Sequence, residues 1–126
     1  MGKFVISISK NQEYYFNLRA GNAQIIGTSE MYKALASAKK GIASVQANAP
    51  IAQIEDQTAE EVQAQKNPKF EIFQDKGGKF RFNLKAKNGQ VVLASQGYAD
   101  LKSCMNGINS VKKNADSPIE GPEKAE

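Results

Sequence analysis

The chain has 126 residues, 40% of them hydrophobic, with 17 basic and 13 acidic side chains and a net charge of +4. This length and composition fit one ordinary domain, and so weak a positive charge provides no dense basic stripe of the kind that nucleic-acid-binding proteins carry. The sequence contains no histidine and a single cysteine, which excludes imidazole-based catalysis, an internal disulfide and a cysteine-rich zinc site.

The first residues alternate between apolar and polar positions, as is typical of a strand. Their apolar run, residues 4–8, is too short for the core of a signal peptide. No segment approaches the ~20 apolar residues that a membrane span needs. The unpaired Cys104 agrees with a reducing compartment. We therefore expect a cytoplasmic protein that has no membrane partner.

The chain contains an internal duplication. When it is shifted by 66 residues, residues 2–49 align with 68–115 without a gap, and 20 of these 48 pairs are identical. Nine of the 20 identical residues are aromatic, branched aliphatic or glycine, so low-complexity sequence does not explain the match. We divide the chain into a first repeat (residues 1–55), a linker (56–67), a second repeat (68–120) and a flexible tail (121–126).

Both repeats predict the same elements in the same order. In the first repeat, alternation predicts strands at residues 3–9 and 14–19, and a third strand around Ile25. Apolar residues then recur every three or four positions over residues 32–45, which predicts a helix, and a short extended segment follows at 51–54. Two such units can join edge to edge. The pattern predicts an α+β fold of two tandem β-β-β-α-β repeats, with one antiparallel sheet and both helices on one face.

Gly41 and Gly107 occupy equivalent places within the two predicted helices. Glycine in a helix costs roughly 0.5–1 kcal/mol relative to alanine. Its presence in both copies suggests a close approach of helix and sheet, and a simple tolerance of glycine is the alternative.

Several motifs of the second repeat resemble one known family. They lie at residues 69–72, 81–86, 88–92, 95–98 and 106–115, and the first repeat carries them in weaker form. Each repeat thus resembles the YegP-like family of small bacterial proteins of uncharacterised function. The resemblance implies that the short last strands are exchanged between the repeats. The fusion of two copies further predicts a monomer with pseudo-twofold symmetry.

The sheet face away from the helices is the first candidate site. Strand parity places these side chains on it: Tyr15, Asn17, Arg19, Arg81, Asn83 and Lys85. Aromatic and cationic groups on an open sheet are a hypothetical platform for single-stranded nucleic acid. A solvated face is the favoured interpretation, with the asparagines bonding a neighbouring strand or turn.

Other repeated or reactive side chains have simpler interpretations. Tyr32 and Tyr98 lead into the helices and are expected as core anchors rather than as the lining of a shared pocket. Cys104 lies on the rim of the apolar stripe and is expected as a buried, unreactive thiol. Lys10 and Lys76 lie in turns, where lysines are usually solvated.

A pair of carboxylates could catalyse hydrolysis without histidine. No acidic residue of one repeat aligns with an acidic residue of the other, and no metal-ligand spacing, phosphate-binding loop or cofactor fingerprint occurs. We expect no metal, no cofactor and no enzymatic activity, and interpret the protein as a binding or interaction module of unknown ligand. The alternatives are weak, salt-sensitive nucleic-acid binding, an unrecognised enzyme with a site between the repeats, and association through sheet edges.

Overall fold

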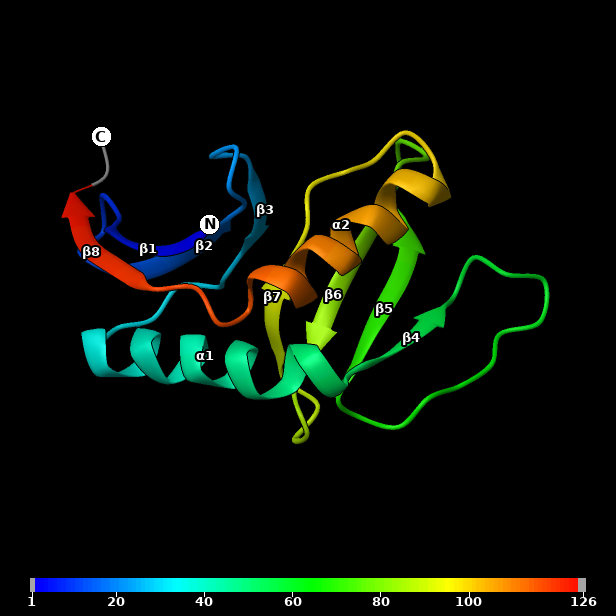
Figure 1. Cartoon of the computed structure of the whole chain (residues 1–126), viewed down its shortest axis with the longest axis horizontal. Helices are drawn as coiled ribbons and strands as arrows, with labels where there is room; N and C mark the ends of the chain where they lie inside the picture. The colour runs from blue at the N-terminus through cyan, green and yellow to red at the C-terminus, as the bar shows by residue number, and fades with distance from the viewer. Residues whose placement is uncertain (1, 125–126) are drawn as a thin grey trace.

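The computed structural model describes residues 2–124, with side chains described as far as residue 122, and shows one sheet and two α-helices (Figure 1). The elements of the first repeat are β1 (Lys3–Ile8), β2 (Tyr14–Arg19), β3 (Ile25–Thr28), α1 (Leu35–Asn48), a 3-10 turn η1 (Ala49–Ile51) and β4 (Gln53–Asp56). Those of the second are β5 (Lys69–Gln74), β6 (Phe80–Lys85), β7 (Val91–Ala94), α2 (Leu101–Asn114) and β8 (Ile119–Lys124). Within these residues, neither helix is long and apolar enough to cross a membrane.

The last strand of each repeat pairs with the other repeat. Across the sheet the strands follow the order β4-β5-β6-β7-β3-β2-β1-β8. The strand β4 therefore lies beside β5, and β8 lies beside β1, as Figure 1 shows for the red and blue ends of the chain. This arrangement confirms the expected exchange and gives the sheet pseudo-twofold symmetry.

The sheet is mixed rather than wholly antiparallel. The inner pairs are antiparallel as predicted, whereas β4 with β5 and β8 with β1 are parallel. The pseudo-twofold axis explains the difference. Because of this axis, β1 and β5 run in opposite directions. The strand β4 is oriented antiparallel to β1 of its own repeat, so it is parallel to β5 of the other repeat. The same holds for β8, which is parallel to β1.

Two predicted boundaries differ from those in the structure. The strand β8 runs to Lys124, so residues 121–124, predicted as a flexible tail, belong to the sheet, and residues 125–126 lie outside the described part of the chain. Asp56 ends β4 rather than starting the linker. Each half of the sheet takes an edge strand from the other repeat, so the repeats are separate in sequence and interlocked in space.

Both helices begin three residues after the tyrosine that opens the predicted helical stripe. Tyr32 and Tyr98 instead form single antiparallel bridges with Tyr14 and Phe80. The spacing of apolar residues alone does not show whether the tyrosine belongs to the helix or precedes it. Each tyrosine packs against the same core as the helix that follows it.

A single hydrophobic core lies between the sheet and the helices. Phe4 and Phe16 meet edge to face at 5.9 Å between ring centroids, and Phe70 and Phe82 do so at 5.7 Å. All four rings are fully buried. The helix α1 contacts β2 and β7, and α2 contacts β3 and β6, so each helix spans strands of both repeats (Figure 1). The two repeats therefore share one core.

The helical glycines lie against aromatic rings. A Cβ on Gly107 would overlap the Tyr98 hydroxyl oxygen and lie 2.8 Å from Tyr98 Cζ and 3.1 Å from a ring carbon of Phe82. A Cβ on Gly41 would meet Tyr32 and Phe16 in the same way. The structure thus confirms the close approach of helix and sheet.

Candidate functional site

The two helices cover one face of the sheet and leave the opposite face, here called the open face, without a helix. The predicted side chains of β2 and β6 lie on the open face, because their neighbours along each strand are core residues. The strands β3 and β7 separate β2 from β6. The predicted residues therefore form two groups, one on each side of the repeat junction, rather than one continuous patch.

Asn17 has a structural role on this face. The residue is only 9% exposed, and its Oδ1 accepts a hydrogen bond of 2.8 Å from the Thr28 hydroxyl on β3. The equivalent Asn83 pairs with Ala94, which has no hydroxyl to donate. Asn17 thus bonds a neighbouring strand, as the favoured interpretation expected.

An ionic network neutralises the cations on the second half of the open face. Lys69 Nζ lies 2.9 Å from Glu55 and 3.2 Å from Glu71, and Lys85 Nζ lies 3.1 Å from Glu71. Sequence reasoning missed this network, because Glu55 and Glu71 become direct neighbours only through the exchange of β4. Lys85 is therefore paired rather than free for a ligand.

Glu55 lies at the end of this network and is 5% exposed. Its carboxylate accepts hydrogen bonds from the Gln57 side chain at 2.8 Å, the Gln65 backbone N–H at 2.8 Å and Lys69. These bonds, that of Gln57 most of all, lower the pKa of the Glu55 carboxyl from its usual 4.5 to about 2. The ionised carboxylate therefore stabilises the fold.

We expect Glu55→Gln to make stability less sensitive to acid. Because the folded-state pKa lies below the unfolded-state value, the stabilisation by Glu55 is complete above about pH 4.5 and is lost as the pH falls toward about 2. Urea unfolding across this range should show the variant less stable than the wild type near neutral pH, with a difference that shrinks in acid. A difference that is the same at every pH would contradict this assignment.

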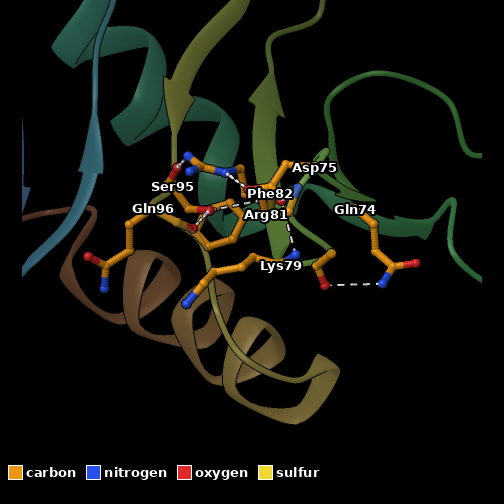
Figure 2. A network of polar contacts seen from close by, with 9 residues as sticks. Gln74, Asp75, Lys79, Arg81, Phe82, Ser95 and Gln96 are labelled. Carbon is orange, nitrogen blue, oxygen red and sulfur yellow. Dashed lines mark hydrogen bonds and ion pairs between the residues drawn. The ribbon is translucent and has the colours of Figure 1, made fainter.

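Arg81 is held at the edge of the repeat junction. Its Nε donates to Asp75 Oδ2 at 2.6 Å and its Nη1 to the Ser95 carbonyl at 3.4 Å, as the dashed lines in Figure 2 mark. The other oxygen of Asp75 accepts the backbone N–H groups of Gly77 and Lys79. The Arg81 bond above all lowers the pKa of the Asp75 carboxyl. The side chain of Arg81 remains 41% exposed, so its position is fixed while its outer atoms reach solvent.

A groove of about 420 Å³, here called the junction groove, crosses the open face between the two groups of predicted residues. At its centre Thr28 of β3 pairs with Ala94 of β7, and these are equivalent positions of the two repeats. The pseudo-twofold axis therefore passes through the groove. The lining consists of Ile25, Gly27, Thr28, Ser29, Arg81, Ala94, Ser95 and Gln96. Among these described lining residues, Arg81 alone is charged.

The two serines of the groove are structural. The hydroxyls of Ser29 and Ser95 accept the backbone N–H groups of Phe16 and Phe82 at 2.8 and 2.9 Å, and each donates to the carbonyl of the next residue at 2.8 Å. Neither hydroxyl has a base beside it that could activate it as a nucleophile within the described part of the chain.

Arg19 lies next to the groove and forms no ion pair with any side chain that the structure describes. Its Nε is buried and has no hydrogen-bond partner among the described residues. The equivalent Lys85 pairs with Glu71, but Val5 stands at the place of Glu71 in the first repeat. Arg19 is the direct cross-strand neighbour of Ile25, which lines the groove.

The remaining candidates take structural positions. Cys104 is buried, and burial, followed by the charge of Asp56, raises the pKa of its thiol to about 11, so the thiolate is scarce. Tyr32 and Tyr98 stack on core phenylalanines. Among the side chains described, residues 2–122, no cluster of acidic or cysteine groups is placed to hold a metal ion.

Comparison with known proteins supports the duplicated architecture. The family described as "Domain of unknown function (DUF1508)" matches the chain twice, at residues 9–56 and 75–120. The chain belongs to the DUF1508 family. UPF0339 protein plu2779 of Photorhabdus laumondii is 43% identical over 117 residues, which are 93% of this chain and 90% of the relative. UPF0339 protein YegP of Escherichia coli K12 is 40% identical over 116 residues, 92% of each chain.

Solved structures of DUF1508 relatives share the fold. The solution structure of yegP from E. coli, a protein of unknown function, has a TM-score of 0.79 and 38% identity, and the match covers 99% of this chain and 95% of that one. UPF0339 protein SO3888 of Shewanella oneidensis has a TM-score of 0.77 and 34% identity, with 98% and 90% covered. The predicted YegP-like resemblance and the tandem α+β fold are confirmed.

Proposed function

We propose that this DUF1508 protein is a non-enzymatic binding module whose junction groove holds a segment of a protein partner. The segment carries an acidic side chain between apolar ones. The proposal rests on one observation. In the groove the guanidinium of Arg81, which Asp75 holds in position, lies beside apolar side chains, including Ile25, which is 43% exposed.

The orientation of Arg81 suits a carboxylate. Asp75 accepts from Nε, and the terminal nitrogens keep further N–H groups that can donate to a second acid. Guanidinium groups bind carboxylates through paired, charge-assisted hydrogen bonds. The charge of Arg19 adds to the attraction at the opposite end of the groove.

The same charges favour a protein partner over the alternatives. A nucleic-acid strand needs several free cations along its phosphates, whereas Lys69 and Lys85 each lie within 3.2 Å of a carboxylate. A hydrolytic site in the junction groove would need carboxylates there, and none is among its described lining residues. The lining of the junction groove therefore favours the non-enzymatic interpretation over the enzyme alternative.

We further propose that the protein acts as a cytoplasmic monomer. Both exchanged strands find their partners within one chain, so the fold needs no second copy. Association through the β8 edge is disfavoured, because Pro122 has no N–H to donate to an added strand.

Selection from a random-peptide display library on the immobilised protein tests the proposed function. We expect enriched peptides to share an acidic residue flanked by apolar ones. Arg81→Gln should weaken their binding about tenfold, because it removes a charge-assisted hydrogen bond. Asp75→Asn should weaken binding less than Arg81→Gln, because it keeps the guanidinium charge and the Oδ1 acceptor of the turn but loses the ion pair that orients Arg81.

Two results would count against the proposal. Enriched peptides without an acid, or peptides that bind Arg81→Gln as well as wild type, would contradict the role of Arg81. Saturable binding of labelled oligothymidine that weakens with added salt would instead support the nucleic-acid alternative.

A further inference from the structure

A second hollow lies away from the open face, between the two repeats. It has a volume of about 240 Å³ and is more enclosed than the junction groove. One wall comes from α1 and the loop before it, and the other from the β6–β7 turn of the second repeat. We call it the tyrosine cleft and define it by Glu30, Tyr32, Ser37, Lys40, Asn88 and Gln90.

The cleft contains two opposite charges that do not neutralise each other. Glu30 and Lys40 both line it, and neither forms an ion pair with any side chain that the structure describes. A ligand with one positive and one negative group can therefore interact with both.

The neutral groups of the cleft add hydrogen-bonding capacity. Burial, followed by the charge of Glu30, raises the pKa of the Tyr32 hydroxyl, so it stays a protonated donor. This hydroxyl lies against Gly41 of α1, and Ser37 stands on the same wall. Asn88 and Gln90, by contrast, bond each other within the turn and form a fixed opposite wall.

We propose that the tyrosine cleft binds a small zwitterion, namely a free α-amino acid. Its ammonium group faces Glu30, and its carboxylate accepts from Lys40 and from the hydroxyl of Tyr32. The volume equals that of about eight water molecules in the liquid, which suits a ligand of a few non-hydrogen atoms and a short side chain. This site is separate from the junction groove and does not depend on it.

The second repeat offers an internal control. The positions equivalent to the defining residues are Gln96, Tyr98, Ser103, Asn106, Asn22 and Gln24. They keep the tyrosine, the serine and both turn amides, but replace the acid and the base with neutral amides. The zwitterion should therefore bind the tyrosine cleft and not its equivalent.

An amide-resolved NMR titration with glycine, L-alanine and L-serine tests the site. We expect saturable shifts at residues 30–44 and 86–92, without matching shifts at 96–110 and 20–26. Propionate and ethylammonium, each with only one of the two charges, should bind at least about tenfold more weakly than L-alanine.

The double variant Glu30→Gln with Lys40→Asn gives the tyrosine cleft the two neutral residues that stand at the equivalent positions of the second repeat. Both side chains are exposed, so the variant should keep the fold, which the same spectra verify. We expect binding to weaken at least about tenfold. Absence of saturable shifts in wild type, equal shifts at both sets of residues, or binding that survives the double substitution would each overturn the proposal.

Discussion

Gly107→Val is expected to lower the free energy of unfolding by about 3 kcal/mol, at the upper end of the usual cost of overpacking a core. The new side chain would meet the Tyr98 ring, with Cζ 2.8 Å from the added Cβ, and a ring carbon of Phe82 at 3.1 Å. Phe82 is fully buried, so its ring cannot move away without disturbing the core. Urea unfolding monitored by circular dichroism measures the difference.

Gly77→Ala is the matched control for this substitution. The nearest atom to its added Cβ is Asp75 Oδ1 at 3.4 Å, an ordinary contact, so stability should change little. If Gly107→Val unfolds within about 0.5 kcal/mol of wild type, the helix does not press on the sheet as the structure shows.

Removal of β8 is the second change with a large expected effect. A chain that ends at Asp116 loses the strand beside β1, including the hydrogen bond of 2.8 Å from the Phe4 N–H to the Pro118 carbonyl. Because the repeats share one core, we expect both to lose protection together. The loss should approach the whole stability of such a domain, about 5 kcal/mol or more.

A chain that ends at Lys124 keeps β8 and serves as the control. Circular dichroism and amide spectra should show the control folded and the shorter chain largely unfolded. A shorter chain with an unchanged unfolding midpoint, or with only its first repeat unfolded, would contradict the interlocked fold.

The strands and the core could be predicted because their signals are local. Alternation in residues 14–19 and 80–85 places phenylalanine and leucine on one face, and the structure buries them there. The full extent of β8 could not be predicted in this way. Gly121 and Pro122 are typical of a loop, and only the neighbouring β1 makes an edge strand of this segment.

The site was predictable in part. Parity placed Arg81 and Lys85 on the open face, but it could not show that Asp75 and Glu71 hold them. The sequence does contain a signal that Arg19 lacks an acidic partner on the neighbouring strand. The repeat alignment sets Val5 against Glu71, which indicates that the first repeat lacks the acid that pairs with Lys85 in the second.

On the proposed function, the junction groove is the binding surface of this protein. The most direct test is an amide-resolved NMR titration of the wild-type protein with the acidic peptide most enriched in the selection. We expect shifts centred on residues 25–29, 94–96 and the backbone amide of Arg81, with a titration midpoint about tenfold higher in peptide concentration for Arg81→Gln. Shifts confined to the outer surfaces of α1 and α2, or unchanged in that variant, would contradict it.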